Sequence, residues 1–577
     1  MRRTFLGWMT AAVLSGFLLA GCGSGGGDAS SFHYDPPPGP TPPPQRPVSF
    51  NLPAYNAGDQ AVLVFTPVSG DEFEQSGNTI QINAVNARQG ECAHEHPHAK
   101  GAFTERCGLS DSIRSFDDRV GLERVRERSE ALRPREVQPR WDGLPKGTPG
   151  ELFHPLANDV EVKIEVVKML DDSQTVHCNI LAEPGIITEA DALQLAQVFD
   201  SANPFDPTAP GAIGLYDRIT GMCGHEWRTN PVGGRDGDER VNLVICSVGT
   251  MSVEGGTLYG LVRFADIFGT DIDPVSNAGE YLYLNYEFLG VPGGTPRENY
   301  SLYGTLAHEF MHVIQLNTKV GQEGTFPHFN PQAADPTTSA YTLSERRTLA
   351  EGFAETTATL CGYGVHKALD GSATGGADIL SYDAINLFLG GESLRVPGAT
   401  GLTTIGTNFW IPFIEPQNTD PYGMGHLFGL HLVDRYGVAK WGELTSSSQI
   451  GLVNLHEVLG VAPEDIFHGF NIALHASSLA GTPAQYDLSR LEPGGLNHYR
   501  PFQTDGAPVF HLLPAAGFVS SSEPTAWIEK VVPPWSTALF HFLGGDGSPW
   551  NLDVVLPMKA RASLIHESPA GTFSNIQ

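Results

Sequence analysis

The spacing of apolar and polar residues differs between the middle of the chain and its two ends. Short runs with the period-two alternation of strands lie near the start, at 60–68 and 159–167, and near the end, at 525–532 and 536–545. From about 301 to 479, apolar residues recur mostly at helical spacing. The pattern predicts an α+β protein with a mixed sheet and a mainly helical core, flanked by small β-rich N- and C-terminal regions.

Three segments ahead of the helical part have clear periodicity. ITEADALQLAQVFD predicts a helix, whereas DGDERVNLVICSV and GEYLYLNYEF predict strands. Asp236, Asp238 and Glu239 open the first of these strands and carry oxygen ligands of the kind that calcium binds. An acidic turn containing glycine needs no metal ahead of a strand, so we prefer the turn and keep calcium as the weaker alternative.

The first residues have the pattern of an export signal. Arg2 and Arg3 precede an apolar run that ends in Leu-Ala-Gly-Cys at Cys22, which is typical of a bacterial lipoprotein cleavage site. We therefore expect Cys22 to be lipidated and the Pro/Gly-rich residues 23–47 to form a disordered tether. The expected location is the cell envelope, on the outer membrane or cell surface. A simple secretory signal or an uncleaved anchor is the alternative.

The net charge argues against one class of function, and the length predicts the number of domains. The formal net charge of −30 opposes nucleic-acid binding, which needs clustered Lys and Arg. A chain of 577 residues is too long for one hydrophobic core, so we expect two or three domains in a monomer.

Six cysteines remain once Cys22 is set aside. An even number in an exported chain favours disulfide bonds, and Cys92–Cys107 is the first pair that we expect. Buried free thiols are the alternative.

The segment GTLAHEFMHVIQLN, 304–317, carries the strongest chemical signal. His308 and His312 lie one helical turn apart, so both imidazoles can bind one metal ion. Glu309 is rotated from them by about 100° on the helix and can accept a proton from a metal-activated water. Zinc held by protein alone needs a third ligand, which must come from elsewhere in the sequence.

A second helical segment, 341–364, supplies candidates for that ligand. Thr342 and Glu345 fit a capping box at its start. Glu351 and Glu355 lie one turn apart and away from the apolar stripe, and buried carboxylates need compensating charge. We predict that Glu351 is the third ligand and that Glu355 accepts the free N–H of a ligand histidine. The alternative is that both carboxylates are solvated.

A third helical segment, YGMGHLFGLHLVDRYG at 422–437, carries Tyr422 and His426 on one face. Either side chain could donate a hydrogen bond to the oxyanion of a tetrahedral intermediate. The alternative is that both only pack in the core.

The order of these segments resembles that of hyicolysin-type bacterial metallopeptidases over roughly 186–475. The resemblance implies a zinc-dependent endopeptidase with a thermolysin-like catalytic core and one Zn²⁺ per chain. On this chain it places the metal ligands at His308, His312 and Glu351, and the general base at Glu309. We therefore divide the chain into a signal peptide, a tether, an N-terminal β-rich region, a catalytic domain and a C-terminal β-rich region, at 1–22, 23–47, 48–185, 186–479 and 480–577.

The predicted function is hydrolysis of peptide bonds in a protein or peptide substrate that lies extended along a sheet edge, for which we suggest 280–286. One alternative is a catalytically inactive surface lipoprotein that keeps the peptidase fold as an adhesin or binding scaffold. Two others are a zinc enzyme that acts on a non-peptide amide and a carbohydrate-binding envelope lipoprotein.

Overall fold

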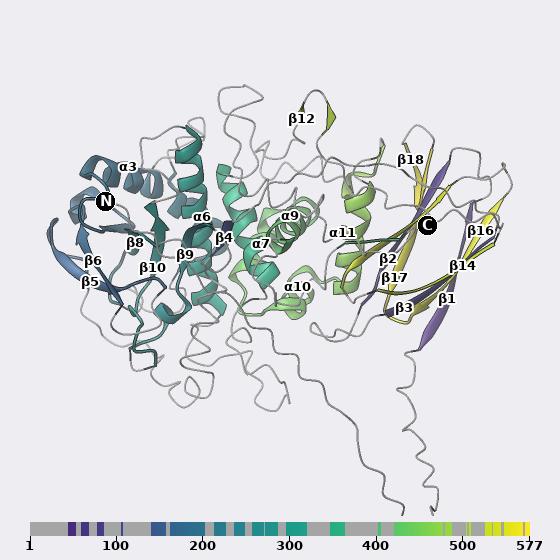
Figure 1. Ribbon diagram of the computed structural model, residues 1–577, viewed down its shortest axis with the longest axis horizontal. Helices are drawn as coiled ribbons and strands as arrows, with labels where there is room; N and C mark the ends of the chain where they lie inside the picture. The colour runs from purple at the N-terminus through teal and green to yellow at the C-terminus, as the bar shows by residue number, and fades with distance from the viewer. Residues whose placement is uncertain are drawn as a thin grey trace, which may run out of the picture. The chain divides into compact units, whose positions relative to one another are not determined.

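Several sheets draw their strands from segments that lie far apart in the chain (Figure 1). Helices and sheets both occur, so the predicted α+β class is confirmed. The computed structural model describes these residues: 44–52, 59–68, 78–85, 105–107, 140–156, 162–201, 213–226, 236–248, 257–270, 272–286, 296–319, 345, 347–363, 402–405, 420–476, 479, 481–486, 503–504, 507–508, 525–532, 535–543, 547, 549–568 and 572–576.

The first strands of the chain pair with the last ones, and Figure 1 shows purple and yellow strands side by side. One sheet has the order β1-β16-β3-β14 and another the order β11-β15-β2-β17-β18; we call them the terminal sheets. Val48 lies opposite Val554, and Leu63 lies opposite both Phe540 and Leu564. The strands are β1 (Gln45–Leu52), β2 (Gln60–Thr66), β3 (Asn78–Val85), β11 (Leu402–Ile405), β14 (Thr525–Val532), β15 (Thr537–Leu543), β16 (Trp550–Pro557), β17 (Arg561–Glu567) and β18 (Phe573–Ile576).

A seven-stranded sheet, the central sheet, has the order β4-β9-β10-β8-β7-β6-β5. Its β7, β8 and β10 are parallel neighbours and buried throughout, as expected for apolar strands covered on both faces. Residues 140–182 of the predicted N-terminal region contribute to this sheet, whereas residues 45–85 contribute to the terminal sheets. The strands are β4 (Glu105–Cys107), β5 (Pro149–Phe153), β6 (Lys163–Lys168), β7 (Cys178–Ala182), β8 (Val241–Cys246), β9 (Thr257–Val262) and β10 (Tyr281–Asn285).

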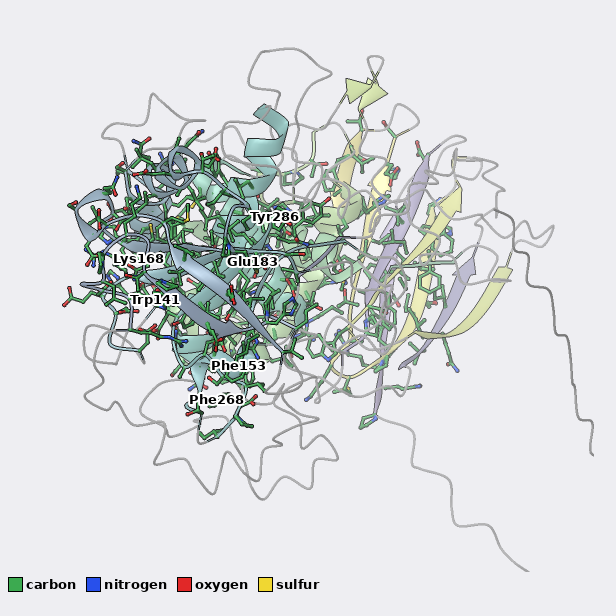
Figure 2. All side chains as sticks on the ribbon, turned by 60° about the vertical axis from the view of Figure 1, so that its left-hand side comes forward. Trp141, Phe153, Lys168, Glu183, Phe268 and Tyr286 are labelled. Atoms are coloured by element: carbon green, nitrogen blue, oxygen red, sulfur yellow. The ribbon has the colours of Figure 1, made fainter. Side chains whose placement is uncertain are left out.

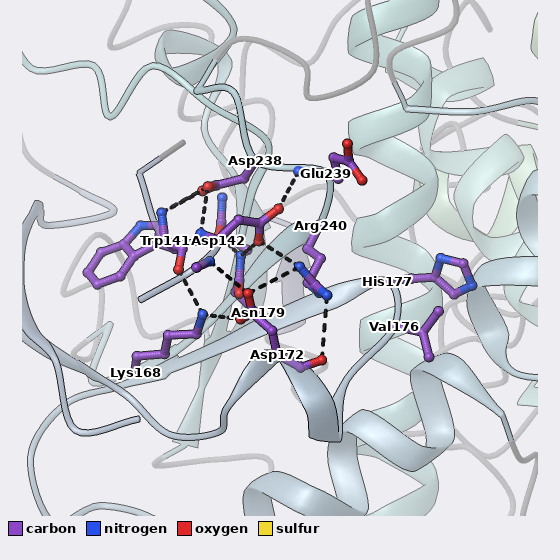
Figure 3. A network of polar contacts seen from close by, with 12 residues as sticks. Trp141, Asp142, Lys168, Asp172, Val176, His177, Asn179, Asp238, Glu239 and Arg240 are labelled. Carbon is purple, nitrogen blue, oxygen red and sulfur yellow. Dashed lines mark hydrogen bonds and ion pairs between the residues drawn. The ribbon is translucent and has the colours of Figure 1, made fainter. Parts of the chain in front are cut away.

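A buried lysine, Lys168, bonds to the segment that leads into β5. Lys168 is only 1% exposed, and its Nζ donates a hydrogen bond to the carbonyl oxygen of Trp141 at 2.7 Å and pairs with the Asp172 carboxylate. Figure 2 labels Trp141 and Lys168 on this side of the protein, and Figure 3 shows their contacts. Residues 140–182 are thus an integral part of the central sheet.

The acidic turn ahead of β8 belongs to the same network (Figure 3). The Asp238 carboxylate accepts hydrogen bonds from the backbone N–H groups of Trp141 and Asp142, and Asp236 accepts one from the Asn242 side chain at 2.7 Å. These bonds satisfy the carboxylates without a cation. These hydrogen bonds explain why the acidic residues form a turn ahead of β8, as we preferred. The described contacts give no reason to place calcium there.

The central sheet positions the helix that carries the histidine motif. Helix α6 packs on β9 and β10, α7 packs on α6, and α9 packs on α7. Within the described residues, no helix is both long and apolar enough to cross a lipid bilayer. The helices are α3 (Glu189–Asp200), α4 (Leu215–Cys223), α6 (Pro296–Lys319), α7 (Arg347–Ala358), α9 (Asp420–Ser446, interrupted at Gly437), α10 (Gly451–Leu459) and α11 (Pro463–Ala476), and a π-helical turn, η5 (Thr359–Tyr363), follows α7.

Glu345 of the predicted capping box lies ahead of α7 and not within its first turn. The helix begins at Arg347, so Glu345 precedes it, and Thr342 lies outside the described residues. The Glu345 carboxylate instead accepts a hydrogen bond from the backbone N–H of Gly451 at 2.7 Å and pairs with buried Lys319 at 3.4 Å. This carboxylate therefore joins the end of α6 to the start of α10.

Glycines let α7 and α9 approach until their backbones touch. A Cβ atom at Gly425 would overlap the carbonyl oxygen of Thr348, and one at Gly352 would overlap the carbonyl oxygen of Gly425. One turn further along α9, a Cβ atom at Gly429 would overlap the Thr356 hydroxyl. Because backbone atoms cannot rotate away, this close contact fixes how far α7 lies from α9.

Helix α11 connects this helical region to the terminal sheets. Phe428 of α9 stacks on Phe467 of α11 with ring centroids 4.7 Å apart, and Phe467 contacts Trp535 edge-on. His468 lies between the terminal strands, with Nδ1 2.9 Å from the Thr66 hydroxyl and Nε2 2.9 Å from the Ser563 hydroxyl.

The described cysteines do not form the expected disulfide bonds. Cys178, Cys223, Cys246 and Cys361 are buried free thiols. For these four the prediction of disulfides is wrong, and the alternative of buried thiols is confirmed. Cys92 lies outside the described residues, and Cys107 is described by its backbone alone.

We predict that Gly425→Ala lowers the free energy of unfolding by about 2 kcal/mol or more, because the added methyl group meets backbone atoms of α7. Urea denaturation measures the change. The matched control is Gly221→Ala in α4, where a Cβ atom would meet nothing within 4 Å. That control should be stabilised by up to about 1 kcal/mol, since alanine is the better helix former. Equal stability of Gly425→Ala and wild type would contradict the close contact.

We predict that acid weakens the attachment of α11 to the terminal sheets. Burial, with a smaller contribution from Arg561, lowers the pKa of His468 from 6.5 to about 4. The folded state therefore binds fewer protons than the unfolded state between these values. Stability from this group is complete above about pH 6.5 and falls by about 3 kcal/mol on acidification to pH 4.

The measurement is the free energy of unfolding as a function of pH for wild type and His468→Gln. Loss of the titrating group should flatten the profile between pH 6.5 and 4, whereas the exposed control His456→Gln should keep the wild-type slope. Identical slopes in wild type and His468→Gln would rule out this origin of acid sensitivity.

Candidate metal centre

Helix α6 presents the two histidines of the motif from within the protein core. It begins at Pro296, a residue suited to a first helical turn, and its residues from 302 to 319 are buried on every face. Leu306 and Phe310 are fully buried, and His308 and His312 lie one turn apart with their Nε2 atoms 3.0 Å apart. A helix covered all round can hold these imidazoles with little freedom to move.

Helix α7 brings a carboxylate to the same spot. Oε2 of Glu351 lies 3.4 Å from Nε2 of His308 and 3.3 Å from Nε2 of His312. Together with the distance between the imidazoles, these values describe a nearly equilateral triangle of ligand atoms. In the described part of the chain, this is the one group of three or more His, Cys, Asp or Glu side chains that could hold a metal ion.

The triangle fits a small tetrahedral cation. Ions with bonds of about 2.0–2.1 Å hold their ligand atoms about 3.3 Å apart, close to the separations of 3.0, 3.3 and 3.4 Å in the triangle. Glu351 is 0% exposed, and neither of its carboxylate oxygens has a hydrogen-bond partner in the described part of the protein. A buried carboxylate without hydrogen bonds is costly, and a bound cation would remove that cost.

The electrostatics of Glu351 favour its charged form. Burial by itself would raise the pKa of the carboxyl group, but the adjacent imidazoles of His312 and His308 outweigh burial and hold the pKa well below its usual range. The side chain is therefore available as an anionic ligand across the physiological pH range.

Glu355 lies on the outer side of His308. Its Oε1 atom is 3.3 Å from Nδ1 of His308, so Glu355 faces the free nitrogen of one ligand histidine, as predicted. A carboxylate at this position holds the proton on Nδ1 and leaves the lone pair of Nε2 facing Glu351 and His312.

His426 of α9 is linked to the end of α7 through the Thr359 hydroxyl. The Thr359 hydroxyl donates to the carbonyl oxygen of Glu355 at 3.0 Å, so it accepts the proton of His426 Nε2 at 2.8 Å. Burial lowers the pKa of His426 to about 4, which keeps the ring neutral. The Nε2 proton is thus already used and is not available for the predicted oxyanion bond. Tyr422 lies in the first turn of α9, but its side chain is outside the described residues.

Glu309 lies against strand β9. A Cβ atom at Gly260 would be 2.9 Å from Cγ of Glu309 and 2.7 Å from Cγ2 of Thr305, so only glycine lets the strand come this close. Sequence reasoning missed Gly260. An isolated glycine within the strand TLYGLV was the available signal, because such a residue often marks close backbone approach.

The edge proposed for an extended substrate is wrong. Strand β10, within 280–286, lies between β9 and β8, and all of its residues are buried. Its alternation of aromatic and apolar residues reflects burial on both faces. The strand next to Glu309 is β9.

A scan against models of protein families gave no match to this chain, and a search of curated proteins found no similar sequence. Its function has to be inferred from the side chains and their geometry.

We predict graded loss of metal affinity around this centre. Wild type should bind one zinc ion per chain, and Glu351→Ala and His312→Ala should bind none at stoichiometric concentration. Glu355→Ala should weaken binding by about 10- to 100-fold, because it orients His308 without binding the ion. Isothermal titration calorimetry after dialysis against chelator measures all four proteins.

The matched control is Glu443→Gln, which alters an exposed carboxylate paired with Lys440 and should bind like wild type. Full affinity in Glu351→Ala would show that the triangle does not hold the ion.

Proposed function

We propose that the protein is a zinc-dependent endopeptidase of the bacterial cell envelope. The observation that carries the proposal is the buried triangle of His308, His312 and Glu351, with Glu309 adjacent to His308 on the same helix. Three protein ligands are the number found at catalytic zinc sites, whereas structural zinc sites use four.

Each residue around the triangle would have a separate role in hydrolysis. When bound, zinc would acidify a water molecule and polarise a carbonyl group. Glu309, held against Gly260, would accept a proton and later deliver it to the departing amine. Glu355 keeps His308 in one tautomer, and the Thr359–His426 pair keeps Glu355 in place.

The resemblance to hyicolysin-type peptidases extends this proposal to a thermolysin-like core. In its favour are a mixed sheet with an antiparallel strand, β9, against the motif helix, and a second helix that supplies Glu351. Strand β9 lies next to Glu309, but β4 pairs with its outer side, so an extended peptide could pair with β9 only in place of β4.

Lipidation of Cys22 and attachment to the outer membrane or cell surface belong to the same proposal. Residues 1–43 lie outside the described part of the chain, so their role stays a prediction from the sequence.

We predict that Glu309→Gln keeps the metal and loses hydrolysis. The amide retains the shape of the side chain but cannot accept a proton, so turnover of casein should fall by about 10²- to 10⁴-fold. Zinc content of the purified variant should stay at one ion per chain, and chelator should abolish the activity of wild type.

Two results would decide against this assignment. Full activity of Glu309→Gln would exclude it as the base. Zinc-loaded wild type that cleaves no protein substrate would point instead to the scaffold or to a non-peptide amide as substrate.

A further inference from the structure

A buried threonine hydroxyl on α6 has no hydrogen-bond partner, although it lies one helical turn from Glu309. Thr305 is only 6% exposed, and its Oγ1 atom meets no donor or acceptor in the described part of the protein. A hydroxyl that is removed from water without a hydrogen bond costs free energy. Such a group in a native core calls for an explanation, and a role at a catalytic site is one.

Other buried threonines in helical segments of this chain satisfy their hydroxyls locally. Thr220, Thr359 and Thr445 each donate to the carbonyl oxygen four residues earlier, at 2.8, 3.0 and 3.0 Å. A helical threonine makes this bond by adopting one of its two common χ1 rotamers. Thr305 does not make it, so its hydroxyl is available to a group on another side chain.

The proposed base lies beside this threonine. Thr305 and Glu309 are four residues apart on α6 and share the face that meets β9. Cγ2 of Thr305 and Cγ of Glu309 would lie 2.7 and 2.9 Å from one point, the position of a Cβ atom at Gly260. Because rotation about χ1 moves threonine between staggered rotamers, it can place the hydroxyl beside Glu309, where the methyl group is in this structure.

The Glu309 side chain is almost wholly enclosed, since the residue is 1% exposed. A base enclosed in this way takes its orientation from donors of the protein rather than from bulk water. Catalytic hydrogen bonds are often long in a free enzyme and shorten when substrate is bound. A hydroxyl one turn away can then donate to one oxygen of the carboxylate and leave the other oxygen to accept a proton.

We propose that Thr305 is a positioning residue for Glu309, whose carboxylate accepts a hydrogen bond from the Thr305 hydroxyl during the reaction. The inference rests on the proposed function and adds one residue to it. While no substrate is bound, the hydroxyl stays unpaired in the core. The protein thereby gives up stability that a methyl group at this position would provide.

The test compares wild type, Thr305→Val and Thr305→Ser as zinc-loaded full chains. Valine has the shape of threonine without the hydroxyl, so Thr305→Val should lower kcat for a casein peptide by about 10- to 100-fold at unchanged KM and zinc content. Serine keeps the hydroxyl, so Thr305→Ser should retain most of the wild-type activity. The urea midpoint of Thr305→Val should rise, because a methyl group replaces an unpaired hydroxyl.

The matched control is Thr318→Val. Thr318 lies near the end of α6, is fully buried, and its hydroxyl also lacks a partner among the described residues. Its replacement should raise the urea midpoint in the same way and leave kcat unchanged. A second control repeats Thr305→Val in the Glu309→Gln background, where it should cause no further loss, since the hydroxyl acts through the base.

The outcomes separate this inference from the function beneath it. Wild-type kcat in Thr305→Val overturns the role of Thr305 and leaves the peptidase proposal standing. Equal losses in Thr305→Val and Thr305→Ser, or a further loss in the Glu309→Gln background, have the same consequence. Zinc-loaded wild type that cleaves no peptide overturns the peptidase and, with it, the role of Thr305.

Discussion

The buried Glu351 carboxylate, which has no hydrogen-bond partner among the described residues, constrains how the surrounding helices must pack. Glu351 is tolerated there because two imidazoles face it at ion-pair distance and because a cation can complete the arrangement. Small changes in the spacing of α6 and α7 would lengthen the 3.3–3.4 Å separations and leave the charge exposed to an apolar environment. The surrounding helices therefore have to hold α7 at a fixed place.

Helix α7 is held at this place by backbone contacts as well as by polar contacts. Gly352 and Gly425 bring the backbones of α7 and α9 into direct contact, and Gly429 leaves room for the Thr356 side chain of α7. At the end of α7 the helix changes to a π-helical turn, and Thr359 at this change joins Glu355 to His426. Such turns often occur at functional sites, where they redirect a side chain that a regular helix would place elsewhere.

Local periodicity predicted the parts of this arrangement that one helix determines. The spacing of His308 and His312 and the placement of Glu351 and Glu355 one turn apart both follow from helical geometry. Pairing between distant strands has no comparable local signal. For this reason the sequence did not reveal that β10 is an interior strand, that β4 lies beside β9, or that the first and last strands share sheets.

The function of single polar residues was harder still to read from sequence. His426 lies on the predicted helix, yet its hydrogen bond to Thr359 depends on how α9 crosses α7. Glu345 fitted a capping box by spacing, but Lys319 and Gly451 determine what its carboxylate binds. Both cases are decided by contacts between segments that are far apart in sequence.

The pairing of the chain's ends has a consequence for how the protein is made. Asn51 of β1 bonds to Asn551 of β16 across 500 positions, so β1 has no partner until nearly the whole polypeptide has emerged from the ribosome or an export channel. Long-range pairing of this kind is slow and leaves strand edges exposed in the meantime. Because α11 packs on β2 and β17 and stacks against α9, maturation of the helical region is coupled to this last closure. A chain that ends before β16 would carry every residue of the metal centre and still lack β17, on which α11 packs.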